Sequence, residues 1–211
     1  MNVGAGTGSY EPIGCDVVAV EPSAAMIGAR MPGAAPAIHG TAESLPFADG
    51  GFDTAMAILS VHHWADQVQG LAELRRVARR QVVLTWDPAF AEAFWLTVDY
   101  LPQIADLNRS VFRPICDVVG ALGGGELQVV EVPHDCTDGF LCAYWRRPEA
   151  FLDPRIRAGI SSFALIEPSA ISAGLDRLRS DLRNGAFWNT HADLAARNSL
   201  DLGYRLVVAG R

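Results

Sequence analysis

Three glycines occupy alternate positions at the start of the chain, in the stretch "NVGAGTGSY". Glycine has no side chain and tolerates unusual backbone conformations, so a turn rich in glycine lets backbone N–H groups approach a ligand closely. Glu21 comes 13 residues after Gly8, at the end of an apolar, β-branched run that predicts a buried strand. A carboxylate there can accept two hydrogen bonds from a ribose diol. Together, Gly4, Gly6, Gly8 and Glu21 predict a site for a ligand that contains a ribose.

Two other glycine-rich sites fit the sequence less well. A Walker loop needs a lysine to hold phosphate, and this chain contains no lysine. The dinucleotide fingerprint needs glycine at its sixth position, where this chain has Ser9. The sequence therefore argues against a nicotinamide-dependent oxidoreductase, which stays as the least favoured hypothesis. The Gly-x-Gly-x-Gly spacing is found in methyltransferases that use S-adenosylmethionine.

The elements that must position these residues alternate between strand and helix. Short apolar runs predict strands, and residues 65–80 place apolar side chains on one helical face, with paired arginines on the polar face. The expected strands are 15–23, 35–40, 53–61, 81–86, 126–134 and 202–210, and the expected helices are 23–31 and 65–80, with mainly helical segments at 88–122 and 140–200. This pattern predicts an α/β fold with a mostly parallel sheet. We expect a single domain across residues 1–211, in which residues 1–87 bind the cofactor and the second half supplies a helical lid.

Composition excludes several classes of protein. The formal net charge of −7 disfavours nucleic acid as a partner. The sequence shows neither a membrane-spanning apolar run nor a signal peptide, so we expect no membrane association. Four cysteines without a C-x-x-C pair indicate reduced thiols and a cytoplasmic location. A metal site at His134, Asp135 and Asp138 is a weak alternative, and we expect no metal.

Five segments occur in the order and spacing of a known family: "NVGAGTG", "VVAVEPS", "GTAESLPFADGGFD", "SVHHWAD" and "ELRRVARRQVVL". Over residues 2–87 the chain resembles class I S-adenosylmethionine-dependent methyltransferases. It is most similar to the small-molecule branch with ubiquinone/menaquinone-biosynthesis-type domains. The resemblance implies a Rossmann-like sheet flanked by helices, S-adenosyl-L-methionine as the cofactor and a small-molecule acceptor.

The resemblance also implies a role for each matching residue. The glycine loop would line the methionine and ribose parts of the cofactor, and Glu21 would hold the ribose hydroxyls. Ala42 and Glu43, after the third strand, would lie at the adenine edge. Leu59 and Ser60, at the end of the fourth strand, would lie near the methionine. The implied cofactor-binding residues are Gly4, Ala5, Gly6, Gly8, Glu21, Pro22, Thr41, Ala42, Glu43, Leu59 and Ser60, with Ser23 as an alternative to Pro22. His62 and His63 would lie at the mouth of the active site, where one of them would act as a base or position the acceptor.

The chain departs from the family in three places. Asn2 and Thr41 stand where the family usually has aspartate, and only "MNV" precedes the glycine loop. A first strand this short predicts unpaired backbone groups in its neighbours. Either the start is truncated relative to the ancestral gene, or another chain fills the slot, and a homodimer is one such assembly. These departures motivate an alternative function, that of a catalytically inactive methyltransferase-fold protein acting as a binding or partner subunit.

Overall fold

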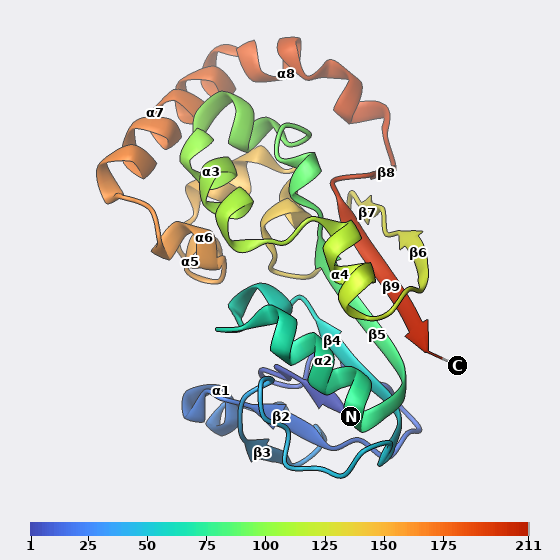
Figure 1. Cartoon of the computed structure of the whole chain (residues 1–211). Helices are drawn as coiled ribbons and strands as arrows, with labels where there is room; N and C mark the ends of the chain where they lie inside the picture. Colours follow the sequence, from blue (N-terminus) through green and yellow to red (C-terminus); the bar gives the residue numbers. More distant parts are fainter. Residues whose placement is uncertain (211) are drawn as a thin grey trace. The chain divides into compact units, whose positions relative to one another are not determined.

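The structure, a computed structural model, describes residues 1–210 and contains a seven-stranded sheet in the order β3-β2-β1-β4-β5-β9-β6 (Figure 1). Pairing is parallel within β3-β2-β1-β4-β5, whereas β6 pairs antiparallel with β9. The strands are β1 Asn2–Val3, β2 Ala19–Glu21, β3 Ala37–His39, β4 Phe52–Ile58, β5 Ala78–Trp86, β6 Glu126–Val129, β7 Val132–Pro133, β8 Ser199–Leu200 and β9 Tyr204–Gly210. This mostly parallel sheet with flanking helices confirms the predicted fold class.

The helices are α1 Ala24–Gly28, α2 Gln67–Val77, α3 Pro102–Val111, α4 Ile115–Ala121, α5 Pro154–Ala158, α6 Ser161–Ala164, α7 Pro168–Asn184 and α8 Ala186–Thr190. Short 3₁₀ helices are η1 Val61–His63, η2 Pro88–Phe90, η4 Leu141–Tyr144, η5 Pro148–Leu152 and η6 Ala192–Ala196, and η3 Leu96–Tyr100 is a π-helix. No described helix combines the length and hydropathy that a membrane span requires.

The chain forms two compact units. Unit 1 comprises residues 1–87, 112–129 and 205–211, and unit 2 comprises residues 88–111 and 130–204. Unit 1 holds the seven-stranded sheet, and the two-stranded β7-β8 ribbon belongs to unit 2. The expectation of one domain with a helical lid stays a prediction.

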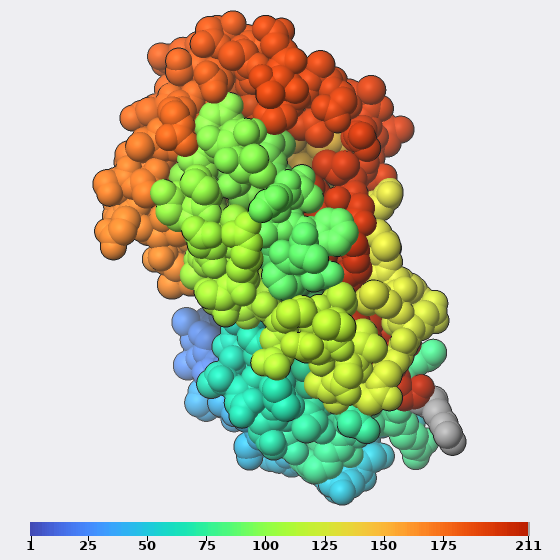
Figure 2. Space-filling view, turned by 45° about the horizontal axis from the view of Figure 1, so that its top comes forward, coloured from blue at the N-terminus to red at the C-terminus, as the bar shows by residue number. Residues whose placement is uncertain are grey.

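Helix α2 shows why the first half folds as the sequence indicates. The side chain of Asp66 caps its N-terminus by accepting a hydrogen bond from the Gln69 N–H (3.0 Å). Leu71, Leu74 and Val77, which lie three residues apart, are fully buried (0% exposed) against the sheet. Figure 1 shows α2 running across β4 and β5, and Figure 2 shows α4 beside it in unit 1. The apolar face therefore forms the centre of the unit 1 core.

Two details of the α2 prediction are wrong. The apolar face predicted for residues 65–80 includes Val68, which is 49% exposed. The helix ends at Val77 and not at residue 80, because Ala78 is already extended and β5 pairs with β4 from that residue onward. Arg79 and Arg80 therefore lie on a strand and not on the polar face of a helix. The backbone ladder to β4 overrides the local helical pattern in this stretch.

Unit 2 is built around large aromatic side chains. The ring of Trp95 meets the edge of Phe187 with 4.9 Å between centroids and also packs against Phe151. Its indole N–H donates to the carbonyl oxygen of Trp145 (2.8 Å), and the Trp145 indole donates to Val132 (3.0 Å). Because Trp145, Phe151 and Phe187 are at most 1% exposed, these aromatics form the core of the unit.

Candidate functional site

The Gly4–Gly8 turn, called the glycine loop below, follows the central strand β1 directly. Gly4, Gly6 and Gly8 all have positive φ angles, of 68°, 52° and 91°. Side chains other than glycine rarely adopt this region. At Gly4 there is also no room for a side chain, since an added Cβ would lie 2.5 Å from the Cβ of Ser60. The alternate glycines are therefore required by the backbone path.

Glu21 lies at the carboxyl end of β2 and is directly linked to the glycine loop. The residue is only 6% exposed. One oxygen accepts the N–H of Gly6 at 2.8 Å, and the other accepts the N–H of Ser23 at 2.9 Å. A carboxylate has about four lone-pair positions, so two remain for other donors. The structure thus brings together the two features from which the sequence predicted a ribose site.

Pro22 and Ser23 continue from Glu21 into α1. Pro22 is exposed, and its carbonyl oxygen accepts a hydrogen bond from the imidazole Nε2 of His39 (2.8 Å). The Ser23 hydroxyl caps α1 by accepting the N–H of Met26 (3.3 Å). This second candidate loop is therefore fixed to the end of β3 on one side and to a helix on the other.

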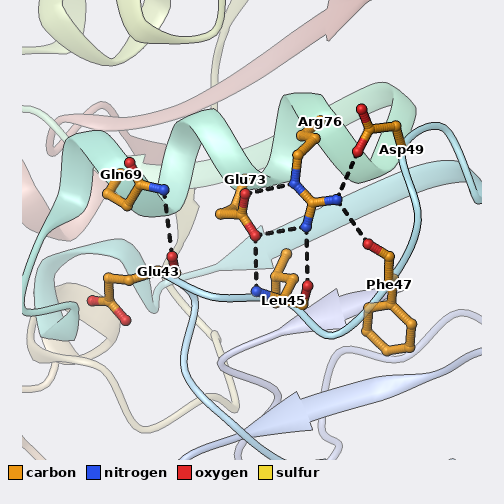
Figure 3. Close-up of polar contacts among 7 residues, drawn as sticks. All are labelled: Glu43, Leu45, Phe47, Asp49, Gln69, Glu73 and Arg76. Carbon is orange, nitrogen blue, oxygen red and sulfur yellow. Dashed lines mark hydrogen bonds and ion pairs between the residues drawn. The ribbon is translucent and has the colours of Figure 1, made fainter.

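The segment Thr41–Gly51, called the acid loop below, contains three further candidates. Ala42 is buried, Glu43 is half-buried and Thr41 is exposed. Glu43 accepts the backbone N–H of Asp66 at 3.1 Å, and its carbonyl oxygen accepts the Gln69 side chain at 3.4 Å (Figure 3). Burial alone would raise the pKa of Glu43, but hydrogen bonds from Asp66 and neighbouring groups together lower that pKa. Glu43 therefore keeps a negative charge at neutral pH.

Arg76 on α2 holds the remainder of the acid loop, as Figure 3 shows. Its guanidinium donates to the carbonyl oxygens of Leu45 (2.9 Å) and Phe47 (2.7 Å) and to the carboxylates of Asp49 and Glu73. Glu73 in turn accepts the Leu45 N–H at 2.8 Å. The hydrogen bond from Arg76 is the main cause that lowers the pKa of Glu73. This network fixes the loop that carries Glu43.

Leu59 and Ser60 lie where β4 ends. Leu59 has a φ of 52°, which is unusual for a residue other than glycine. Its N–H donates to the carbonyl oxygen of Leu84 on β5 (2.9 Å), and the Ser60 hydroxyl donates to that of Val3 on β1 (3.0 Å). Three strands therefore hold this strained turn in place, and strain of this kind is concentrated at functional sites.

His62 and His63 lie side by side on η1, with 3.9 Å between their ring centroids. His62 is half-buried and stacks on Phe112 at 4.2 Å, whereas His63 is exposed. Burial, together with the adjacent His63, lowers the pKa of His62 from 6.5 to about 3. Burial also lowers the pKa of His63, but the negative charge of Glu21 opposes that shift. Among residues 1–210, the buried Nδ1 of His62 has no hydrogen-bond partner.

Several residues of this region were missed by sequence reasoning. Phe112, Glu11 and Arg30 were not singled out. Arg30 donates to the Gly6 carbonyl oxygen (3.0 Å) and pairs with Glu11. No spacing rule connects these positions, which lie in three different connections of the chain. In the described residues 1–210, no group of three or more His, Cys, Asp or Glu side chains could hold a metal ion.

Comparisons with known proteins agree with this geometry. A family model described as a methyltransferase domain matches residues 1–85. A candidate methyltransferase from an antibiotic biosynthesis pathway of Anabaena variabilis is 33% identical, with a TM-score of 0.92, and the match covers 100% of this chain and 89% of that chain. No curated protein matches the chain.

Two more distant structures share the fold. YcgJ from Bacillus subtilis has 16% identity and a TM-score of 0.53 over 98% of this chain and 88% of its own. A geranyl diphosphate methyltransferase, solved in complex with S-adenosylmethionine, has 18% identity and a TM-score of 0.50. The match covers 100% of this chain and 76% of that chain. The 33% identity to the Anabaena protein over the whole of this chain, together with the family model over residues 1–85, establishes that the chain belongs to the class I S-adenosylmethionine-dependent methyltransferases.

Proposed function

We propose that this protein transfers the methyl group of S-adenosylmethionine to a small-molecule acceptor, with the cofactor held by the glycine loop and Glu21. The observation that carries the proposal is that Glu21 is only 6% exposed and that its carboxylate accepts a hydrogen bond from the Gly6 N–H. Its two remaining lone-pair positions suit the two hydroxyls of a ribose. The glycine loop would then lie along the ribose and methionine parts of the ligand.

The other candidate residues complete this proposed arrangement. Pro22 and Ser23 follow Glu21 and would lie beside the adenine. Thr41, Ala42 and Glu43 would lie at the adenine edge, where the charged Glu43 can accept a hydrogen bond from the adenine amino group. Leu59 and Ser60, in the strained turn after β4, would lie near the methionine.

The proposed acceptor is a small molecule. Support comes from the Anabaena relative, which is assigned to an antibiotic biosynthesis pathway and is 33% identical over the whole of this chain. We infer that this protein also methylates an oxygen, nitrogen or carbon atom of a small compound. Displacement at a sulfonium needs mainly orientation and the exclusion of water, and correct orientation can contribute about 7–11 kcal/mol.

His63 is the better candidate for a base. A general base works best when its pKa is near the working pH, and His62, with a pKa of about 3, holds a proton too weakly. His63 is exposed, and the charge of Glu21 opposes the lowering of its pKa. We therefore assign proton removal to His63. The neutral His62, packed on Phe112, would position the acceptor.

Isothermal titration with S-adenosylmethionine and S-adenosylhomocysteine tests the proposal. We expect binding to the wild type and at least about tenfold weaker binding to Glu21→Ala, since hydrogen bonds to a charged group contribute about 1.5–3 kcal/mol. His63→Ala should bind the cofactor like the wild type but lose turnover with a panel of small acceptors. An absence of wild-type binding at millimolar ligand overturns the proposal, and equal effects of the two substitutions contradict the assigned roles.

A further inference from the structure

The glycine loop lacks a support that such loops commonly have. In many nucleotide sites the glycine-rich turn opens a helix, whose N-terminal N–H groups face the ligand. Here residues 9–18 run to β2 through turns and irregular backbone, without a helix. Another part of the chain must therefore hold the loop in the conformation that its positive φ angles require.

That support is a buried ion pair. The side chains of Arg30 and Glu11 are only 9% and 8% exposed and pair with each other. Arg30 also donates to the carbonyl oxygens of Gly6 (3.0 Å) and Ala35 (2.9 Å). Glu11 accepts the Ala35 N–H at 2.7 Å. The pair thus links the glycine loop to the segment that precedes β3. Arg30 donates to three separate acceptors, namely the Glu11 carboxylate and the carbonyl oxygens of Gly6 and Ala35.

The backbone N–H groups of the glycine loop are almost all taken by acceptors within the protein. Those with partners belong to Gly4, Ala5, Gly6 and Gly8. Among the described residues 1–210, no acceptor is found for the Thr7 N–H. A half-buried N–H without a protein acceptor is left to bond to water or to a ligand, so this amide is the candidate donor to a ligand.

Arg30 sets the direction of that amide. In a planar trans peptide the C=O and the N–H point in opposite directions. Because Arg30 holds the Gly6 carbonyl, the Thr7 N–H of the same peptide points away from the ion pair. On the next peptide, the Thr7 carbonyl accepts the Met31 N–H at 2.9 Å. Both peptides are therefore fixed by the segment that follows α1.

We propose that Arg30 and Glu11 are positioning residues for cofactor binding, which aim the Thr7 N–H at the carboxylate of the methionine part. This inference rests on the proposed function. In this proposal the ion pair, and not a helix, holds the loop in its binding conformation before the cofactor binds.

The experiment separates positioning from stability. Removing one member of a buried pair is strongly destabilising, whereas replacing both by apolar residues is often neutral. We therefore compare Arg30→Met with the double variant Glu11→Leu/Arg30→Met. The single variant should melt at a lower temperature, and the double variant should recover the melting temperature. The double variant should still bind S-adenosylhomocysteine about tenfold more weakly than the wild type, since the hydrogen bond to Gly6 stays lost.

A matched control removes an exposed pair from α7. Asp176 and Arg179 form an ion pair with 70% and 41% exposed side chains, and Asp176→Leu/Arg179→Met should leave the affinity for S-adenosylhomocysteine unchanged. A Glu11→Leu/Arg30→Met protein that binds like the wild type overturns the inference.

Nuclear magnetic resonance of the wild type provides a test that does not depend on the folding of a variant. The Thr7 amide signal should shift when S-adenosylhomocysteine is added. Binding without a shift of this signal overturns the inference alone, whereas no binding at all by the wild type overturns the proposed function.

Discussion

Two loops of unit 1 are each held by one arginine, but the two arginines differ in their access to water. At the glycine loop, Arg30 and its partner Glu11 are 9% and 8% exposed. At the acid loop, Arg76 is 31% exposed, and its two carboxylate partners differ, since Asp49 is 81% exposed and Glu73 only 11%. Both guanidiniums donate to backbone carbonyl oxygens, so the two networks are similar in geometry and differ mainly in burial.

This difference decides what each network contributes. When a buried pair loses one member, the other charge stays without water and without a partner, which is costly. When a partly exposed arginine such as Arg76 is removed, water can replace the hydrogen bonds on its exposed side, although Glu73 on its buried side loses a partner. The comparison indicates that the glycine loop depends on its ion pair, whereas the acid loop is only stiffened by Arg76.

The largest expected effect is that of Arg30→Met. The free energy of unfolding, measured by urea titration, should fall by about 3–5 kcal/mol, because Glu11 is left buried and unpaired. Glu11→Leu made alone should also destabilise the protein, since Arg30 then lacks its countercharge. The comparison fails if Arg30→Met lowers the free energy of unfolding by no more than Arg76→Met does.

Arg76→Met should destabilise the protein less than Arg30→Met does. Its main effect should be local, because the carbonyl oxygens of Leu45 and Phe47 would be solvated in place of their bonds to Arg76. Hydrogen exchange should accelerate in residues 41–51 and stay unchanged in β5. Arg75→Met on the same helix is the control, since Arg75 makes an exposed hydrogen bond to Ala121 (3.3 Å). Equal acceleration in both variants would show that the Arg76 network does not hold the acid loop.

The histidine pair extends the comparison to pH and should give the smallest effect at neutral pH, where His62 is uncharged in both the folded and the unfolded chain. Because the pKa of His62 falls from 6.5 to about 3 on folding, the unfolded chain takes up a proton below pH 6.5 that the folded protein does not. Stability should therefore fall as pH falls from about 6.5 towards 3. We measure melting temperatures across this pH range. The fall in melting temperature with falling pH should be less steep in His62→Gln than in His63→Gln, because His63 is exposed. A steeper slope in His62→Gln than in the wild type would contradict this assignment.

Much of the sheet and part of the site could be predicted from local patterns. The apolar runs around Val20 and Ala57 indicated parallel strands, and the spacing of Leu71, Leu74 and Val77 gave α2. Glu21 was placed correctly at a strand end because it directly follows the buried residues of β2. The end of α2 was misjudged, because residues 78–80 continue the helical pattern but pair with β4.

The sequence by itself determined the alternation of strands and helices, the glycine loop and the acid one strand later. These features depend on the local backbone, and residue type and spacing govern local backbone conformation. Only the tertiary structure showed that Arg30 reaches Glu11 and Gly6, that Phe112 covers His62 and that Leu59 adopts a left-handed turn. Such contacts join residues about 20 to 50 positions apart, and their geometry follows from how the strands pack and not from any period in the sequence.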